Sequence, residues 1–459
     1  GVSMAVADWT RPEAQPVQRI LILGGGFAGV YAALNLQRTL ADLPAEVAIV
    51  NRENFFVFYP LLPEILSGSI ETESVLNPIR LVVPKATLYV GEVTSIDLAH
   101  QRVEIRHGLY RHYQEPATLY YDHLILALGG VPRTAGIPGL AEYAFDVQRL
   151  SHAFALRNHL IDTLEQADIE TDPDRKRQLL TFVIAGGGAN GVEVAAHIRD
   201  LVYGAIRYYQ NIEPADLHVI LIHSGNRLIP DLPSRLGYYA ERLLRRRGIE
   251  ILFDRRVSRV EPDAVYLTDG EVIRADTIVG SVGVMPNPMV ANLPVPHDPR
   301  GAIAVNNDLS VPGYPNVWAL GDNAFVVDPY TGKPYPLTAQ TAVREAKLVA
   351  RNIAASLRGE PLKPFTYRTI GAMVSLGHRS AVAYIRGLTF SGFIAWWLYR
   401  TYYLLQLPRW DKRLRVVFDW TLDLLFPPVL VQLKVGQPAP SSERARSRPV
   451  PAQAADSKD

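Results

Sequence analysis

The sequence predicts an α/β protein with two Rossmann-like dinucleotide-binding domains and a C-terminal amphipathic helical segment that associates with membranes. Three observations in the 459-residue chain predict this class. A strand-like apolar run meets the spacing GxGxxG at residues 24–29, the same arrangement returns at residues 186–191, and aromatic and basic residues gather after residue 390. Two complete strand–glycine–helix units are far more specific evidence of nucleotide binding than one.

The first unit begins at residue 20 with the apolar run ILIL, which is followed by glycines and a helix-forming stretch. Gly24 allows a tight turn, Gly26 lets backbone N–H groups approach a pyrophosphate, and Gly29 lets the helix pack closely on the strand. The helix N-terminus adds partial positive charge. Asn51 and Arg52 follow the next predicted strand, where an acid often bonds the adenosine ribose. An ordinary polar strand end is the alternative.

The second unit repeats this pattern, with Gly186, Gly188 and Gly191 after the apolar run at 179–185. A further predicted strand at 217–222 ends in His223. We expect both units to bind nucleotides. The alternative is that the second unit keeps its close packing without a ligand.

The remaining pattern predicts further elements of the same fold. Residues 121–130, 275–283 and 316–324 are expected to be core strands with glycines near their ends, residues 151–170 a helix, and Thr338 a helix N-cap. Other expected features are an aromatic loop that walls a flat ring (54–68), strands of a small antiparallel insert (88–90 with 103–105) and a solvated linker (171–178).

The composition excludes several kinds of chemistry. The formal net charge is +1, so no general electrostatic attraction to nucleic acid or anionic membranes is expected. The absence of cysteine excludes disulfides, thiolate–metal sites and redox-active dithiols, and no metal site is expected. The N-terminus lacks the basic start and apolar core of a secretory signal.

The C-terminal stretch predicts contact with a membrane surface. Residues 390–407 are interrupted by Arg400 and followed by Pro408, so they are not expected to span a bilayer. Four of the six tryptophans lie between residues 396 and 420 among several basic residues, and aromatic rings beside cations suit the bilayer interface. We expect Arg400 to extend outward to the headgroups. A dimer interface, or a helix pair packed on the body, is the alternative.

Taken in order, the two GxGxxG units and the sequences LALGG, SVGVMPN and VWALGD resemble the two-dinucleotide-domain flavoproteins. Within that family, FYPLLPEILSG, AQTA and the aromatic C-terminal stretch resemble type II NADH:quinone oxidoreductases. The resemblance spans about residues 19–433. It implies FAD in the first unit, NADH or NADPH as electron donor in the second, and a membrane quinone as acceptor.

The resemblance also implies roles for individual residues, with Glu193 and Gln340 catalytic. Glu193 would position the cofactor or relay a proton, and a plain helix-dipole contact is the alternative. Gln340 would contact the quinone headgroup, unless it only starts a helix. The implied contacts are Gly24, Gly26, Gly29, Asn51, Arg52, Val93, Gly129, Gly321 and Asp322 for FAD; Gly186, Gly188, Gly191, His223 and Gly283 for the nicotinamide cofactor; and Ala339, Gln340 and Arg344 for the quinone.

Three positions depart from the family pattern. His223 stands where members that prefer NADH usually carry an acid, Arg344 stands where a glutamine is usual, and Asn51 stands where an acid usually bonds the FAD ribose. Because His223 does not repel a phosphate, we expect weak discrimination between NADH and NADPH.

Six parts of the chain are expected: a flexible leader (1–18), the first part of an FAD-binding domain (19–170), an NAD(P)H-binding domain (171–300), the second part of the FAD-binding domain (301–370), a membrane-associating segment (371–435) and a disordered tail (436–459). The tail is rich in Pro, Ala and Ser.

Because a thiol relay is excluded, the chemistry that remains is hydride transfer from the nicotinamide directly to the flavin. The expected protein is a non-proton-pumping NAD(P)H:quinone oxidoreductase, monotopic on the cytoplasmic face of the cell membrane, which forms a homodimer and binds no nucleic acid. The alternatives are a soluble NAD(P)H-dependent flavin reductase with another acceptor and a flavin-binding sensor without quinone turnover.

Overall fold

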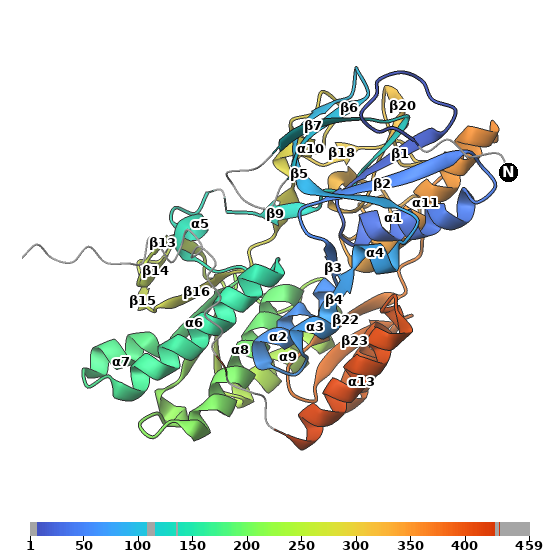
Figure 1. The fold of residues 1–459 in the computed structure, drawn as a ribbon. Coiled ribbons are helices and arrows are strands. Elements are labelled where there is room, and N and C mark those ends of the chain that lie inside the picture. The colour runs from blue at the N-terminus through green and yellow to red at the C-terminus, as the bar shows by residue number, and fades with distance from the viewer. Residues whose placement is uncertain (1–6, 108–114, 135, 427–430, 432–459) are drawn as a thin grey trace, which may run out of the picture.

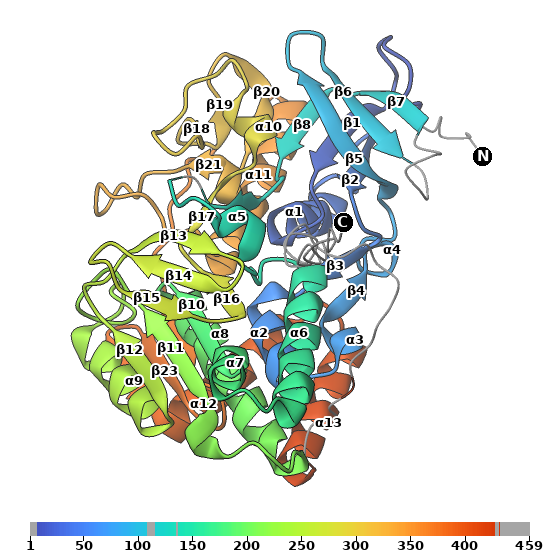
Figure 2. The ribbon, with the colours of Figure 1, turned by 90° about the vertical axis from the view of Figure 1, so that its left-hand side faces the viewer.

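Two sheets with parallel centres form the framework of the computed structural model, which describes residues 7–107, 115–134, 136–426 and 431. The first sheet has eight strands in the order β19-β20-β8-β1-β2-β5-β6-β7, and the second has four in the order β12-β11-β10-β16. Figure 1 shows the first sheet at the upper right and the strands β13 to β16 at the left, and in Figure 2 the strands of the second sheet lie below those of the first.

The first sheet carries the first glycine unit. Its parallel centre comprises β20 (Tyr314–Ala319), β8 (His123–Leu126), β1 (Gln18–Leu23), β2 (Ala45–Asn51) and β5 (Thr87–Asp97). Antiparallel strands extend it: β6 (Arg102–His107), β7 (Glu115–Tyr120) and β19 (Ser310–Val311). The helices α1 (Phe27–Thr39) and α11 (Ala339–Arg358) pack against each other beside this sheet (Figure 1). Strand β1 is buried from residue 19 onward, as its apolar run predicts.

The second sheet carries the second glycine unit. It comprises β10 (Thr181–Ala185), β11 (His218–Ile222), β12 (Ile249–Leu252) and β16 (Thr277–Gly280), all parallel. Helices α8 (Ala189–Ala205) and α9 (Ser234–Arg246) pack on it. A three-stranded antiparallel sheet follows: β13 (Val257–Glu261), β14 (Ala264–Leu267) and β15 (Val272–Arg274).

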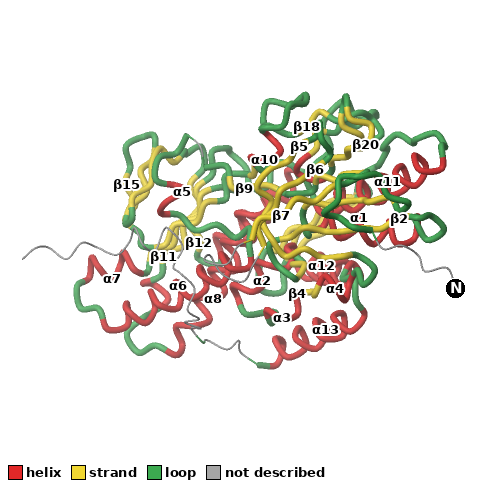
Figure 3. Tube along the Cα trace, turned by 45° about the horizontal axis from the view of Figure 1, so that its top comes forward, coloured by secondary structure: helices red, strands yellow, loops and turns green. Residues whose placement is uncertain are grey.

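Short elements connect the two halves. Strand β9 (Gly130–Pro132), next to the first sheet, pairs with β17 (Val284–Pro286), next to the second. Figure 3 shows α2 (Leu62–Ser67), α6 (Leu150–Ile169) and α8 as neighbouring helices, and they contact one another. The other short elements are β3 (Phe55–Val57), α3 (Thr72–Val75), β4 (Leu76–Pro78), α4 (Ile79–Val82), α5 (Leu140–Tyr143), α7 (Pro173–Leu179), α10 (Pro288–Ala291), β18 (Ile303–Ala304) and β21 (Ala324–Phe325).

The C-terminal part is a three-stranded sheet and two helices. The antiparallel strands β22 (Gly371–Ser375), β23 (Ala381–Ile385) and β24 (Leu388–Ser391) precede α12 (Gly392–Gln406) and α13 (Trp410–Leu425). In Figures 1 and 3, α13 lies at the outer edge of the molecule. Among the described residues, no helix combines the length and apolarity needed to cross a bilayer.

Most of the expected core elements are present, including the helix at α6 and the N-cap at Thr338, whose Oγ1 accepts from the backbone N–H of Thr341 at 3.3 Å. The prediction of a loop at 54–68 is wrong, because this stretch contains β3 and α2. Helix α2 has Pro63 near its start and ends at Gly68 with a φ of 76°, which are ordinary helix boundary signals.

Two polar stretches are also more ordered than expected. The expected linker at 171–178 contains α7, whose N-cap Asp172 accepts from the backbone N–H of Asp174 at 3.0 Å. The described part of the expected flexible leader packs on the first sheet, because Trp9 is buried and its carbonyl accepts from the backbone N–H of Tyr120. The expected tail at 436–459 lies outside the described residues.

Candidate functional site

Three glycines shape the first glycine-rich turn, two because a Cβ would collide with backbone and one because it leaves the backbone open. A Cβ on Gly24, whose φ is 106°, would lie 1.9 Å from the carbonyl oxygen of Ala127. A Cβ on Gly29 would lie 1.8 Å from the carbonyl oxygen of Gly24, so strand and helix touch there. A Cβ on Gly26 would meet nothing within 4 Å, so the backbone at the start of α1 is open to a ligand.

The second turn reproduces this geometry. A Cβ on Gly186, whose φ is 119°, would lie 2.0 Å from the carbonyl oxygen of Ser281, and one on Gly191 would lie 1.8 Å from the carbonyl oxygen of Gly186. Gly188, at the N-cap of α8, again meets nothing within 4 Å. The two predicted nucleotide turns are therefore the same structure built twice.

In each unit, the residue at the end of the second strand accepts a hydrogen bond from the backbone N–H of the middle glycine of the turn. The side-chain Oδ1 of Asn51 accepts from the backbone N–H of Gly25 at 3.0 Å, and the Nδ1 of His223 accepts from the backbone N–H of Gly187 at 3.2 Å. Burial lowers the pKa of His223, which keeps Nδ1 free of a proton and able to accept. This shared role was not predicted from the sequence.

One cavity of about 1790 Å³ runs from the first glycine turn to the N-terminal end of α8. Among the residues that the resemblance implies, those that line it are Gly24, Gly26, Asn51, Arg52, Val93, Gly129, Glu193, Gly283, Gly321, Asp322 and Ala339. Those that do not are Gly29, Gly186, Gly188, Gly191, His223, Gln340 and Arg344. The cavity therefore joins the FAD side of the first unit to α8 of the second.

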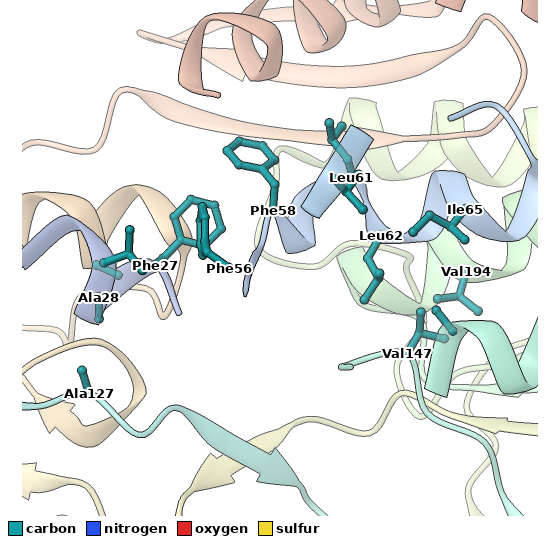
Figure 4. Close-up of a cluster of buried hydrophobic side chains, with 14 of the residues drawn as sticks. Phe27, Ala28, Phe56, Phe58, Leu61, Leu62, Ile65, Ala127, Val147 and Val194 are labelled. Atoms are coloured by element: carbon teal, nitrogen blue, oxygen red, sulfur yellow. The ribbon is translucent and has the colours of Figure 1, made fainter. Parts of the chain in front are cut away.

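The aromatic stretch at 55–59 forms part of this wall by strand alternation. Phe55, Val57 and Tyr59 line the cavity, whereas Phe56 and Phe58 are buried in the core. Figure 4 shows Phe56 and Phe58 beside Phe27, and their rings lie 5.1 and 5.2 Å from the Phe27 ring. Because alternate side chains of an extended segment face opposite sides, only half of the stretch can meet a ligand.

Glu193 is the acid in the first turns of α8 that faces the cavity. Its Oε1 accepts from the backbone N–H of Ser375 in β22 at 2.9 Å. Burial raises the pKa of Glu193 to about 8, and the negative charge of Glu64 adds to this rise. The carboxyl group is therefore mostly neutral at pH 7 and can donate a proton.

A second group of acids lies where α11 begins. Asp322 lines the cavity, and burial raises its pKa, an effect that Arg300 opposes. Glu345, on the second turn of α11, is buried, and desolvation raises its pKa to about 8. Both groups lie near the backbone of Gly321, close to the N-terminus of α11, where a helix dipole favours negative charge.

Of the three residues implied for the quinone, Ala339 and Gln340 lie at or beside the cavity, and Arg344 does not line it. Ala339 lines the cavity, and the Nε2 of Gln340 beside it donates to the Oη of Tyr402 in α12 at 3.0 Å. The next residue, Tyr403, lines the cavity itself. Arg344 is exposed and its guanidinium lies 5.3 Å from the ring centre of Tyr367.

The expectation that Arg400 extends outward is wrong. Its guanidinium carbon lies 4.1 Å from the ring centre of Trp396 and 4.6 Å from that of Trp420, and an Nη atom lies 3.7 Å from a carboxylate oxygen of Asp423. Arg400 is only 9% exposed. Burial lowers its pKa, and nearby Glu64 and Asp423 oppose that effect. Arg400 therefore joins α12 to α13 inside the protein.

The sequence did not predict a role for several residues of this site. Tyr402, Tyr403 and Ser375 reach the cavity or its acids only through the fold. Glu64, buried in α2, accepts from the Nε1 of Trp420 at 2.9 Å and carries a raised pKa. Glu64, Tyr402 and Tyr403 lie in stretches that carry the family resemblance, but their roles could not be predicted because their partners lie far along the chain.

Comparison with known proteins gives the same class of protein that the sequence motifs resemble. The chain matches the family described as pyridine nucleotide-disulphide oxidoreductase over residues 18–346. It is 33% identical to type II NADH:quinone oxidoreductase Ndh of Mycobacterium tuberculosis, covering 90% of each chain. It is 33% identical to demethylphylloquinone reductase NdbB of Synechocystis sp., covering 89% of this chain and 96% of that one.

The solved structures agree on the fold. NDH2 of Plasmodium falciparum in complex with NADH superposes with a TM-score of 0.82 at 18% identity, covering 90% of this chain and 99% of that one. The paired glycine turns and their shared cavity define a flavoprotein with two dinucleotide-binding units. The chain belongs to the pyridine nucleotide-disulphide oxidoreductase family and, within it, to the type II NADH:quinone oxidoreductases. The 459-residue sequence contains no cysteine.

Proposed function

We propose that this protein transfers two electrons from NADH or NADPH, through FAD, to a membrane quinone without pumping protons. The observation that carries the proposal is the single cavity that reaches both the first glycine turn and the N-terminal end of α8. Two dinucleotides, one bound in each unit, can come into contact only in a space that both units share. Bound FAD supplies the chemistry of accepting a hydride and delivering two electrons.

The residues at the first unit fit FAD. The open backbone at Gly26, the turn at Gly24 and the N-terminus of α1 form a cradle for a pyrophosphate. Val93 and Gly129 line the cavity along its length, and Asp322 lies farther along, before α11. Since no glycine of either turn is next to a histidine and cysteine is absent, FAD is expected to bind without a covalent link.

Residues near the second unit would place the nicotinamide. Ala189 and Asn190 begin α8 and line the cavity, as does Gly283 after β16. Glu193 lies one turn further along α8 and faces the same space. In this arrangement Glu193 holds a proton within the cavity at neutral pH, where the reduction of a quinone to a quinol consumes protons.

The quinone would approach where α11 and α12 meet. Thr338, Ala339 and Tyr403 line this end of the cavity. Gln340 and Tyr402 stand beside it, and their hydrogen bond ties the start of α11 to α12. Gln340 keeps an amide oxygen and a second N–H with which it can contact a carbonyl headgroup.

Replacing Gln340 with alanine is expected to lower quinone-dependent turnover about tenfold and to leave ferricyanide-dependent turnover within about twofold. The reason is the loss of one hydrogen bond to the headgroup, while the nicotinamide side is untouched. Steady-state assays with the two acceptors give the measurement. Tyr402→Phe is the matched control, because it removes only the partner of Gln340. Equal losses with both acceptors, or the same quinone defect in Tyr402→Phe, would make Gln340 a structural residue.

The wild-type enzyme is expected to use NADPH within about 10- to 100-fold of NADH, and His223→Glu is expected to shift the preference toward NADH. A glutamate keeps an acceptor for Gly187 but repels a 2′-phosphate, an effect of about 1–3 kcal/mol, or 5- to 150-fold. The ratio of kcat/KM for the two nucleotides is the measurement. His223→Gln is the uncharged control and should not shift the ratio. A wild type that already excludes NADPH beyond this range contradicts the assignment.

The faces of α12 and α13 that look outward are largely apolar, although Gln406, Arg415 and Thr421 are exposed there too. The exposed large apolar side chains include Phe393, Ile394, Trp397 and Leu405 on α12, and Trp410, Leu414, Val417, Phe418, Leu422, Leu424 and Leu425 on α13. On the opposite faces, Tyr399 and Trp420 are buried. Two amphipathic helices that pack on the body and expose apolar stripes fit a bilayer interface, and we propose that this surface lies on the cytoplasmic face of the membrane.

The proposed reaction is tested with the purified holoenzyme, NADH and a short-chain ubiquinone analogue. The expected result is one quinol formed per NADH oxidised, followed by ultraviolet absorbance under anaerobic conditions. Turnover with dyes and none with any quinone would favour the soluble flavin reductase instead. A flavin that NADH cannot bleach would favour the sensor. Homodimer formation is a separate proposal, which the molecular mass of the detergent-solubilised enzyme tests.

A further inference from the structure

A small pocket opens where α9 meets β24, just before the start of α12. Its volume is about 100 Å³. Helix α9 contributes Arg235, Leu236, Tyr239 and Arg242, and the other wall consists of Thr389 and Ser391. Among the residues that the structure describes, no acidic side chain lines it. The cavity therefore presents two cations and three hydroxyl groups, a set of donors that suits an oxyanion.

The two arginines line this pocket and make no other polar contact among the described residues. Arg235 and Arg242 are seven residues apart, so they lie on the same side of α9 at a separation of about 10 Å along its axis. Both are exposed, and within the described ranges neither side chain has a hydrogen bond or an ion pair. Neighbouring Arg245, by contrast, pairs with Glu241 at 3.2 Å. Guanidinium groups bind phosphate through paired N–H donors.

The pocket borders the apolar surface of α12. Ser391 is the residue before that helix, and Phe393, Ile394 and Trp397 on its first turns are exposed. Tyr239 packs against this corner, because a Cβ on Gly392 would lie 3.0 Å from its Oη. A polar, cationic recess thus stands directly beside an apolar stripe. A phospholipid has the same order of parts, a phosphate next to acyl chains.

We propose that this pocket binds the phosphate of an anionic glycerophospholipid whose acyl chains lie along α12. The proposal rests on the membrane contact proposed above. The chain as a whole has a formal net charge of +1, so it offers little general attraction to an anionic surface. Local recognition by Arg235 and Arg242 would give the enzyme a preference for anionic lipid that its net charge cannot.

The experiment uses the full-length holoenzyme and sedimentation with two kinds of vesicle, one of phosphatidylcholine alone and one containing 30% phosphatidylglycerol as the stated probe. Wild-type protein is expected to partition more strongly to the anionic vesicles at about 0.15 M salt. Arg235→Ala/Arg242→Ala should lose about 30-fold of that partitioning, from two cations near an anionic surface. Its binding to phosphatidylcholine should stay within about twofold.

Two control variants separate a pocket from general charge. Arg106→Ala/Arg256→Ala removes the same charge from exposed arginines elsewhere and should behave as wild type. Arg235→Lys/Arg242→Lys keeps the charge but not the paired donors, and should lose several-fold of the anionic preference. Equal binding by the lysine variant and the wild type, or an equal loss in the Arg106/Arg256 control, would overturn the pocket.

Three further outcomes bear on the ligand and on the membrane proposal. If radiolabelled inorganic phosphate binds wild type and not the double alanine variant, while vesicle binding is equal in both, the ligand is a free anion and the lipid proposal fails. If wild type binds neither vesicle, the membrane proposal itself fails. If it binds both vesicles equally, only the headgroup site is overturned.

Discussion

Glu193→Gln is expected to lower quinone-dependent turnover by about 10²- to 10⁴-fold, the range for loss of a general acid or base. Glutamine has the shape of a neutral carboxyl group and can still accept from the Ser375 backbone N–H. It should therefore preserve the fold of α8 and its contact with β22, while it removes the transferable proton. Turnover with NADH and a short-chain quinone, with the KM for NADH, is the measurement, and we expect that KM to change by less than about threefold.

The pH dependence gives a second readout of the same group. Because the pKa of Glu193 is raised to about 8, its protonated form predominates below that pH. Wild-type turnover should therefore fall as the pH rises through 8, and this limb should be absent from Glu193→Gln. A variant that keeps wild-type turnover and the wild-type pH profile would leave Glu193 a structural residue.

Stability should change with pH in the same window. A Glu whose folded-state pKa is raised above its usual value of 4.5 stabilises the fold fully below about pH 4.5, and this contribution is lost as the pH rises to about 8. The ionised carboxylate then lacks part of its hydration, which destabilises the folded state. Glu193→Gln should consequently have a higher Tm than wild type at pH 9, which also shows that low turnover does not come from unfolding. The matched control for Glu193→Gln is Glu345→Gln, which removes another acid of raised pKa that lies outside the α8 end of the cavity.

The two nucleotide turns could be predicted because their cause is local. A Cβ at Gly24 or Gly186 would collide with a neighbouring backbone oxygen, so the chain marks these turns by glycine at fixed spacing. The core strands follow from apolar runs in the same way. These signals are contained within about a dozen residues, and they fix both units and the place where their strands end.

The electrostatics of the site could not be predicted in this way. Glu193 takes its hydrogen bond from Ser375, 182 residues away, and Glu64 bonds Trp420, 356 residues away. The pKa of a carboxyl group depends on such partners and on burial, which only the fold sets. Arg400 shows the same limit, since a cation among aromatic residues suits both a lipid interface and a buried contact between helices.

Replacing the apolar stripe of α13 is expected to release the enzyme from membranes. Trp410, Leu414 and Phe418 recur at intervals of four residues, and with Leu425 they face outward. Burial of one such side chain contributes about 1.5–3 kcal/mol. Serine at all four positions should therefore lower vesicle partitioning by at least about 100-fold, measured by sedimentation with phosphatidylcholine vesicles.

Point substitutions test this surface better than removal of both helices. Trp396 and Tyr399 of α12 and Trp420 of α13 are buried, so deletion would open the core and could unfold the protein. The matched control is serine at four exposed apolar positions elsewhere: Leu81, Ile169, Tyr208 and Tyr330. This control should still bind vesicles as wild type does.

Turnover with a quinone held in the membrane should depend on this surface, whereas turnover with soluble acceptors should not. The α13 variant should keep ferricyanide turnover within about twofold, because the cavity and both glycine turns are unaltered. It should lose most turnover with a long-chain quinone held in vesicles and retain turnover with a short-chain quinone in solution. High salt should leave wild type on the vesicles, since salt screens charges and leaves buried apolar contacts in place. A serine variant that still sediments with vesicles, or wild type that salt alone releases, would show that this face meets something other than the bilayer.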